Sequence, residues 1–349
     1  MKFSNTLIHW YLQFKRDLPW RNTNNPYAIW LSEIILQQTR VSQGQPYYEA
    51  FITAFPTVFD LANADEQDVL KLWQGLGYYS RARNLHQTAK EIAFSRDGIF
   101  PQNYKELLDL KGVGTYTAAA IASFAYNEPV AVLDGNVFRV LSRYFNIHSD
   151  IAAPKSKIEF QNLAQELLPE KDANLFNQAI MEFGALQCVP KNPNCQACVF
   201  SNSCAALQHK TVSILPIKLK KTKVTIKYYT YLLLKDESNQ FIVQQRTGKG
   251  IWENLYEFPF IETSHQNSID QLKKIIEQKT FYDQKPIDIM LLNEKPILHK
   301  LSHQHLFIQF YLLTFNSQLP DSKPLDSIRK LPFPIIIYNF MLLNDFFSE

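Results

Sequence analysis

The stretch LLDLKGVGTYTAAAIASFAY, residues 107–126, decides how the first half of this chain folds. It joins one helical run to an alanine-rich helix through a tight turn, in which Gly112 and Gly114 flank a valine. Such a turn exposes backbone N–H groups beside a helix N-terminus, and together they attract a phosphate without any basic side chain. The alternative is an ordinary glycine turn in a helical hairpin, and this stretch alone does not choose between the two.

Outward from this hairpin, the first 215 residues have the pattern of an all-helical domain. Apolar residues recur at spacings of three and four in TLIHWYLQF, YAIWLSEIILQQ, EQDVLKLW and NVFRVLSRYF. Prolines between these segments are predicted to break the helices, at positions 26, 46, 56, 101, 129 and 154.

The pattern changes after Pro216. Strand-like runs follow, VTIKYYTYLLL, QFIVQQR and LFIQFYLLTF, together with one helical segment, SIDQLKKIIEQKTF. The apolar face of that helix carries Ile269, Leu272 and Ile276. We therefore expect a domain boundary between residues 206 and 224.

Length and composition indicate an ordinary globular protein of two domains. The 349 residues are 46% hydrophobic and 20% charged, which excludes the disordered and fibrous classes. No apolar run reaches the ~18 residues of a membrane helix, and no signal-peptide core is present, so we expect a cytoplasmic protein without a membrane partner. The net charge of +3 does not by itself indicate nucleic acid, and the basic run Lys218–Lys227 is either a solvated linker or a DNA contact.

Two acids occupy notable positions. Asp134, in VAVLDGNVFRVLSRYF, comes directly before a helix, where an acid commonly caps the N-terminus. Glu33, in YAIWLSEIILQQTRV, is embedded among large apolar residues. A carboxyl group buried there would have a raised pKa and could act as a general acid. The local pattern alone favours the other interpretation, an exposed Glu between buried neighbours.

All four cysteines lie in one loop, CVPKNPNCQACVFSNSC at residues 188–204. Cys188, Cys195, Cys198 and Cys204 follow the spacing C-x6-C-x2-C-x5-C, with two prolines turning the chain between the first two. In a reducing cytosol such a cluster indicates metal ligands rather than disulfides. Tetrahedral zinc and a cubane iron–sulfur cluster both suit four thiolates, and the spacing leaves the choice open.

Taken together, the hairpin, the following acid and the cysteine loop resemble the helix–hairpin–helix DNA glycosylases that carry a [4Fe–4S] cluster. Within that superfamily the chain looks like the MutY family of adenine glycosylases. The supporting blocks are LPWR at 18–21, WLSEIILQQTRV at 30–41, FPTVFDLANA at 55–64, LWQGLGYYSRARNLH at 72–86, LDGNVFRV at 133–140 and FNQAIMEFGA at 176–185. They cover nearly all of residues 1–210 in order.

The resemblance implies a fold of two domains. An all-α glycosylase domain would span residues 1–210, with one [4Fe–4S] cluster held by the four cysteines in the loop 188–204. A linker over 211–224 would lead to an α/β Nudix-like domain over 225–349. The resemblance also implies a monomer, associated with the nucleoid if the chain is bacterial.

The implied activity is base excision repair of double-stranded DNA. The enzyme would flip out adenine mispaired with 8-oxoguanine, or with guanine, and hydrolyse its N-glycosidic bond. Glu33 aligns with the family's general acid, and Asp134 with the carboxylate that stabilises the oxocarbenium-like sugar. Tyr116 and Phe138 stand where strand-cleaving or related enzymes place a lysine, so a monofunctional enzyme without a Schiff base is expected. Tyr116 and Asn136 would flank Asp134.

The remaining implied residues contact the DNA. Gln38 and Tyr78 match residues that intercalate beside 8-oxoguanine, while Gly112 and Gly114 belong to the phosphate-binding hairpin. Arg21 and Glu182 match residues of the adenine pocket, where they would offer hydrogen bonds to the base; for each, the alternative is an ordinary surface or packing role. Two other hypotheses stay open from the sequence: a lesion-binding protein without catalysis, and a zinc-stabilised DNA-binding module.

The second half resembles the Nudix-like domain of the same family in two places. These are GIWENLYEFPF at 250–260 and LSHQHL at 301–306, in which Ser302 and His303 align with a loop that reads 8-oxoguanine. Leu301, Asn254 and Tyr256 depart from the commonest form of these motifs. A true Nudix hydrolase needs a helix rich in glutamates that bind metal, and LKKIIEQ offers only one, so diphosphate hydrolysis is not expected.

Overall fold

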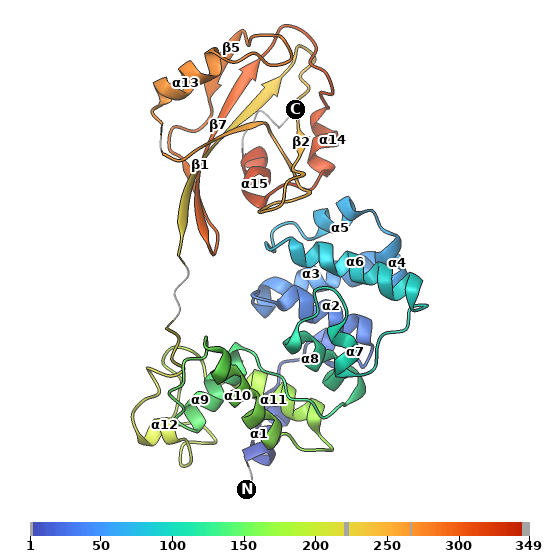
Figure 1. Cartoon of the computed structure of the whole chain (residues 1–349), viewed down its shortest axis with the longest axis vertical. Coiled ribbons are helices and arrows are strands. Elements are labelled where there is room, and N and C mark those ends of the chain that lie inside the picture. Colours follow the sequence, from blue (N-terminus) through green and yellow to red (C-terminus); the bar gives the residue numbers. More distant parts are fainter. Residues whose placement is uncertain (1–2, 220–222, 266, 344–349) are drawn as a thin grey trace. The chain divides into compact units, whose positions relative to one another are not determined.

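Figure 1 shows the protein as a computed structural model that describes residues 3–219, 223–265 and 267–343. The described residues form two compact units. The first unit comprises residues up to 63 and from 84 onward to the end of the first described range, and the second comprises residues 64–83 and those after 222. The division falls inside one helix, α6 (Ser80–Ser95). No helix among the described residues is long and apolar enough to span a membrane.

The first unit is helical, as the spacing of its apolar residues predicts. Besides most of α6, its elements are α1 (Phe3–Phe14), η1 (Pro19–Arg21), α2 (Pro26–Leu36), α3 (Val41–Ala54), α4 (Val58–Asn63), α7 (Tyr104–Leu108), α8 (Thr115–Tyr126), α9 (Gly135–Tyr144), α10 (Pro154–Leu167), α11 (Ala173–Leu186) and α12 (Ala205–Gln208). Pro26 and Pro154 begin α2 and α10, because the fixed φ of proline suits the first helical position.

Pro46 does not break a helix, contrary to the prediction. It lies inside α3, and the helix continues on both sides of it. The ring removes the hydrogen bond to the carbonyl of Ser42, but both residues are exposed, so water can satisfy that carbonyl. A proline on the solvent side of a helix is therefore tolerated.

The core of the first unit forms where its long helices pack together. Helix α11 lies against both α1 and α9, while α8 lies against α2 and α7. Residues 118–122 of α8, four alanines and one isoleucine, are all buried. At Gly184 of α11 an added Cβ would lie 2.7 Å from the Cβ of Asn136, so this glycine lets α11 approach the start of α9 closely.

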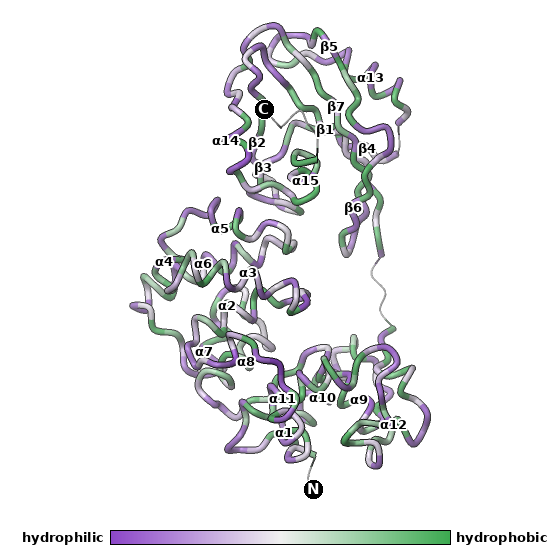
Figure 2. Tube along the Cα trace, turned by 180° about the vertical axis from the view of Figure 1, so that it is seen from behind, coloured by the Kyte–Doolittle hydropathy of each residue, from purple (hydrophilic) through white to green (hydrophobic). Residues whose placement is uncertain are grey.

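The second unit contains a mixed five-stranded sheet, a separate two-stranded sheet and helices. Its strands are β1 (Thr225–Lys235), β2 (Gln244–Gln245), β3 (Tyr256–Glu257), β4 (Phe260–Thr263), β5 (Asp288–Leu291), β6 (Ile297–Lys300) and β7 (Gln304–Thr314), and its helices are α5 (Glu66–Leu72), α13 (Ile269–Glu277), α14 (Leu325–Lys330) and α15 (Ile335–Leu343). The strand order is β4-β1-β7-β5, with β6 also paired to β7. Strands β1 and β7 are parallel, and the other pairs are antiparallel. Figure 2 shows hydrophobic stretches along β1 and β7, whose central residues are buried.

Some predictions for this half were only partly right. The runs that became β1 and β7 are confirmed as strands, but QFIVQQR contains only the two-residue strand β2. Helix α13 forms with Leu272 and Ile276 buried, whereas Ile269, its first residue, is 44% exposed. The helices α14 and α15 were not predicted.

The chain remains attached to the first unit after α12. The backbone N–H of Ile151 donates to the carbonyl of Ile217 at 3.0 Å, and that of Leu219 donates to the Asp150 carboxylate at 3.2 Å. Within the basic run that follows, Lys220 and Lys221 lie outside the described residues.

Candidate active site

A cavity of about 520 Å³ opens within the first unit, lined by residues from α2, α8, α9 and α11. Apolar side chains such as Trp20, Ile29 and Phe124 form part of its wall. The cavity brings together six of the residues singled out in the sequence: Arg21, Glu33, Tyr116, Asp134, Asn136 and Glu182.

Glu33 is a buried acid of this cavity, with 7% of its surface exposed. Helix α2 buries every residue from Tyr27 to Ile35, so the exposed position that the local pattern favoured is wrong. The hydroxyl of Tyr116 donates a hydrogen bond to Oε2 of Glu33 at 2.7 Å. Burial raises the pKa of Glu33 to about 7, and nearby Asp134 adds to this rise, although the Tyr116 hydrogen bond opposes it.

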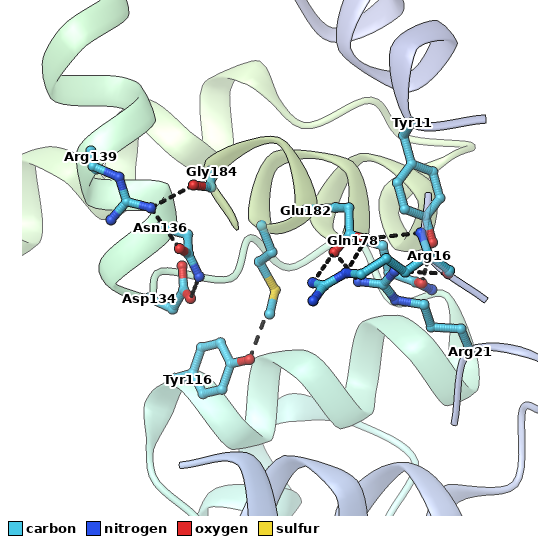
Figure 3. A network of polar contacts seen from close by, with 11 residues as sticks. Tyr11, Arg16, Arg21, Tyr116, Asp134, Asn136, Arg139, Gln178, Glu182 and Gly184 are labelled. Atoms are coloured by element: carbon cyan, nitrogen blue, oxygen red, sulfur yellow. Dashed lines mark hydrogen bonds and ion pairs between the residues drawn. The ribbon is translucent and has the colours of Figure 1, made fainter. Parts of the chain in front are cut away.

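Asp134 caps α9 and also faces the cavity. Its Oδ1 accepts from the backbone N–H of Val137 at 2.8 Å, and its Oδ2 accepts from Nδ2 of Asn136 at 2.7 Å. Burial raises the pKa of Asp134, while these hydrogen bonds act in the opposite direction. Figure 3 shows Asp134 beside Asn136, with Tyr116 of α8 nearby.

Glu182 on α11 is bound by two arginines (Figure 3). Arg16 donates from Nε to Oε1 at 2.8 Å and from Nη2 to Oε2 at 2.6 Å, and Arg21 donates from Nη2 to Oε2 at 2.7 Å. Burial alone would raise the pKa of Glu182, but the charged hydrogen bonds outweigh it and lower the pKa to about 2. Sequence reasoning missed Arg16, since one arginine in a charged N-terminal segment gives no signal of a buried partner.

A chain of hydrogen bonds leads from the acid on α9 to the cysteine loop. Arg139 donates from Nη2 to Oδ1 of Asn136 at 2.8 Å and from Nε to the carbonyl of Cys188 at 2.8 Å. The same guanidinium reaches the carbonyl of Gly184 at 2.6 Å. Sequence reasoning missed this arginine as well, although an arginine within the amphipathic helix NVFRVLSRYF was the available signal.

The four cysteines line one pocket, together with Arg143 and several aromatic side chains. Nη1 of Arg143 lies 3.4 Å from Sγ of Cys188. Burial and the neighbouring cysteines raise the pKa of Cys198 to about 11, so a bound cation is needed to favour its thiolate. In the described part of the chain no group of three or more His, Cys, Asp or Glu side chains is placed to hold a metal ion. Four cysteine sulfurs that line one pocket are a donor set that fits an iron–sulfur cluster and a tetrahedral zinc ion alike.

A second cavity, of about 530 Å³, lies within the second unit. It brings together Tyr78, from the loop before α6, and Ser302 and His303, from the turn between β6 and β7. Tyr78 has a φ of 46° and is 45% exposed. Gln38, the other predicted intercalating residue, belongs to the first unit, is exposed with a φ of 58°, and does not line either cavity.

The hairpin glycines have different surroundings. Gly112 has a φ of 78°, and an added Cβ would lie 2.8 Å from the Cβ of Asn84, so both the backbone and the packing require glycine. Gly114 is exposed, and apart from its own chain neighbours no atom lies within 4 Å of where its Cβ would be. The start of α8 is therefore open to a ligand.

Known families and proteins match both units of the chain. The family described as HhH-GPD superfamily base excision DNA repair protein matches residues 31–170, and the NUDIX domain matches residues 230–342. Adenine DNA glycosylase of Buchnera aphidicola subsp. Baizongia pistaciae (strain Bp) is 38% identical over 307 residues, covering 88% of this chain and 84% of that relative. Adenine DNA glycosylase of Homo sapiens is 41% identical over 215 residues, covering 59% of this chain and 39% of its own length.

Two solved structures match the helical part. A thermostable thymine-DNA glycosylase is 30% identical with a TM-score of 0.55, covering 59% of this chain and 95% of that protein. A non-covalent endonuclease III–DNA complex, at 20% identity and a TM-score of 0.52, covers 60% of this chain and 99% of that protein, and shares the fold. With the helix–hairpin–helix unit, the Nudix-like sheet and a relative matched over most of both lengths, the chain belongs to the adenine DNA glycosylase (MutY) family.

Proposed function

We propose that this protein excises adenine mispaired with 8-oxoguanine, and with guanine, from double-stranded DNA. The observation that carries the proposal is the pairing of Glu33 with Tyr116 beside Asp134 in one cavity. A volume of about 520 Å³ is sufficient for one base turned out of the helix. Two carboxyl groups in different surroundings suit this reaction, since one can give a proton while the other faces the positive sugar.

Glu33 acts as the general acid. A pKa of about 7 leaves a large protonated fraction at neutral pH. The proton passes to N7 of adenine, and the electrons of the breaking C–N bond leave with the base, which departs neutral. The Tyr116 hydroxyl, which already donates to Oε2 of Glu33, then stabilises the carboxylate that remains.

Asp134 stabilises the sugar as an anion. The hydrogen bonds from Val137 and Asn136 hold its two oxygens and favour the ionised form against burial. A carboxylate facing the cavity offsets the positive charge that develops when the base leaves. Water then adds its hydroxyl to the sugar carbon, and its proton passes to one of the two carboxylates.

The reaction ends at the abasic site. No lysine is among the residues that line the cavity in the described part of the chain. Tyr116 and Phe138 stand at the positions where a lysine would be needed, and a phenol or phenyl ring cannot form the Schiff base that leads to strand cleavage.

Arg21 contacts the edge of the flipped adenine, and Glu182 holds Arg21 in place. Each oxygen of Glu182 already accepts a hydrogen bond from an arginine, so its direct contact with the base is secondary. The guanidinium of Arg21 lines the cavity, and its N–H groups are suited to the acceptor nitrogens of a base.

The DNA duplex contacts both units in this proposal. The open turn at Gly112 and Gly114 binds a backbone phosphate at the start of α8. Gln38 and Tyr78 fill the gap left by the flipped base, since an exposed amide and an exposed ring can stack between bases.

The second unit reads the opposite base. The cavity that holds Tyr78, Ser302 and His303 offers a ring for stacking and two polar side chains for hydrogen bonds to 8-oxoguanine. In the sequence, we propose a glycosylase domain over 1–210, a linker over 211–224 and a recognition domain over 225–349, to which the segment 64–83 contributes Tyr78. We propose that the protein acts as a monomer and, in a bacterial cell, at the nucleoid in the cytoplasm.

One [4Fe–4S] cluster is assigned to Cys188, Cys195, Cys198 and Cys204, which line a single pocket. When bound, the cluster ties the loop 188–204 together by iron–thiolate bonds. Arg139 connects the start of that loop to the helix that carries Asp134. An absorption band near ~400 nm in the purified protein would support the cluster, and its absence together with bound zinc would contradict it.

The test of the activity is single-turnover release of adenine from a duplex with adenine opposite 8-oxoguanine. An A·T duplex is the control, and each reaction is quenched with and without hot alkali. We expect strand breaks only in the mispair and only after alkali. Breaks without alkali would indicate a lyase, and no release at all would favour a protein that only binds lesions.

A further inference from the structure

Residues 64–83 pack within the second unit, although the rest of the helical half belongs to the first. This segment contains α5 and the loop that carries Tyr78. The sequence of this segment does not indicate that it belongs to the second unit, because its motifs continue the series of motifs that resembles the glycosylase domain. Hydrogen bonds connect the segment to residues beyond position 250.

Lys71 of α5 caps the C-terminal end of α14. Its Nζ donates to the carbonyl of Arg329 at 2.7 Å and to that of Leu331 at 3.2 Å, and lies 4.1 Å from the ring centre of Tyr338. The last carbonyls of a helix have no intrahelical donor and carry the negative end of its dipole. A cation is therefore well placed there, between two carbonyls and an aromatic face.

The turn just before β3 forms hydrogen bonds with residues near both ends of the segment 64–83. Arg83 donates from Nη2 to Oε2 of Glu253 at 2.7 Å, and from Nη1 to the carbonyl of the same residue at 2.8 Å. At the other end, Nδ2 of Asn254 donates to Oε1 of Glu66 at 2.6 Å. One turn thus binds residues on both sides of the Tyr78 loop.

Further hydrogen bonds lie between these ends. Nε2 of Gln67 donates to the hydroxyl of Tyr256 at 3.0 Å, and Oε1 of Gln74 accepts from the backbone N–H of Phe333 at 3.2 Å. Tyr256 at the start of β3 and Asn254 in the turn before it thus both help to hold the segment.

The loop between the fixed ends has an unusual backbone. Gly75, Gly77 and Tyr78 have φ values of 106°, 71° and 46°. Glycine adopts such values readily, but tyrosine does so only where its surroundings hold it. The carbonyl of Gly77 accepts from Nε1 of Trp73 at 3.0 Å, which fixes the loop from inside.

We propose that Lys71 and the turn residues 253–256 are positioning residues for reading the opposite base. They hold the Tyr78 loop against the turn at 302–303, so the recognition cavity is complete only while the segment 64–83 is fastened to the second unit. This inference rests on the proposed function, in which that cavity reads 8-oxoguanine. These residues set the preference for 8-oxoguanine over guanine and leave the chemistry on adenine unchanged.

The test compares Lys71→Met with Lys273→Met in the full chain. Lys273 is a matched control, because it is an exposed lysine on α13 of the same unit and lines neither cavity. Single-turnover adenine release is measured opposite 8-oxoguanine and opposite guanine. We expect Lys71→Met to lower the ratio of the two rates about tenfold, with release opposite guanine lowered much less than release opposite 8-oxoguanine. Lys71→Arg should keep most of the ratio, and Lys273→Met should leave both rates as they are.

A second variant removes a single hydroxyl. Tyr256→Phe should lower the ratio about two- to threefold, since it removes one hydrogen bond and keeps the ring. Faster hydrogen exchange of the amides at 75–80 should accompany the loss in both variants.

Three outcomes decide the inference. An unchanged ratio in Lys71→Met, while Ser302→Ala lowers it, would overturn the positioning role and leave the proposed function standing. Equal losses opposite both bases, with a lower melting temperature, would show a purely structural role and also overturn it. If the unaltered protein shows no preference for 8-oxoguanine, the proposed function of the second cavity is wrong instead.

Discussion

The two cavities have nearly the same volume, about 520 Å³ and 530 Å³, but they differ in how deeply their functional side chains are buried. In the first, Glu33 is buried and its pKa is raised to about 7. In the second, Tyr78, Ser302 and His303 are exposed. Desolvation, not volume, therefore distinguishes a site suited to proton transfer from one suited to recognition.

The two cavities also differ in the kind of element that positions their functional residues. The acids of the first are placed by long helices that pack in one core, with Asp134 fixed as the cap of α9. The second is built from two loops, one of which needs remote contacts to keep its backbone conformation. Changes in the first should thus affect the rate of chemistry, and changes in the second should affect the choice of opposite base.

The largest effect is expected at Glu33. Glu33→Gln keeps the shape of the side chain but removes the proton, so single-turnover release of adenine should fall about a thousandfold or more while DNA binding is largely retained. Glu159→Gln, the same change at an exposed position on α10, is the control and should have no effect. A Glu33→Gln enzyme with a normal rate would contradict the role of Glu33 as the general acid.

A somewhat smaller loss is expected at Asp134. Asn in its place can still accept from the backbone N–H of Val137, so the cap of α9 should survive and the melting temperature should change little. The negative charge facing the sugar is lost, and the rate should fall about a hundredfold. Parallel measurement of rate and thermal unfolding separates the two roles, and equal loss of both would mean that Asp134 matters only as a cap.

The Glu33→Gln change that lowers the activity should increase the free energy of unfolding at high pH. The pKa of Glu33 is raised from 4.5 to about 7 in the folded chain, so the folded state binds the proton more tightly than the unfolded state. The resulting stabilisation is fully present below pH 4.5 and is lost as pH rises to about 7, a change of about 3 kcal/mol. Glu33→Gln should therefore unfold at higher denaturant than the unaltered protein at pH 8, but not at pH 4. Equal stability at pH 8 would indicate that Glu33 carries no burial cost.

The smallest effect is expected in the second cavity. Replacing both Ser302 and His303 by Ala should lower the preference for 8-oxoguanine over guanine about tenfold, because two exposed polar contacts are lost. Release of adenine opposite guanine should remain close to normal. A loss of rate opposite both bases would mean that this cavity contributes to the chemistry as well.

Much of the fold followed from the sequence where apolar periodicity was regular. The helices of the first half and strands β1 and β7 are examples, since their patterns reflect burial on defined faces. Periodicity failed at α2, which is buried on nearly all sides, so no stripe could indicate whether Glu33 was exposed. The family resemblance suggested its role, whereas the local pattern favoured an exposed position.

Contacts between segments that lie far apart in the sequence could not be predicted from it. Arg16 became important only because the fold brings Glu182 to it, and Lys71 only because α14 ends beside it. Neither residue has a local pattern that differs from a surface charge. The placement of residues 64–83 in the second unit has the same origin, in side chains that pair across long stretches of chain.

The pH dependence of single-turnover adenine release opposite 8-oxoguanine tests the central claim most directly. If Glu33 gives the proton with a pKa of about 7, the rate should be nearly constant below that pH and should fall about tenfold per unit above it. A rate that stays constant from about pH 6 to pH 9 would contradict the assignment of Glu33 as the general acid.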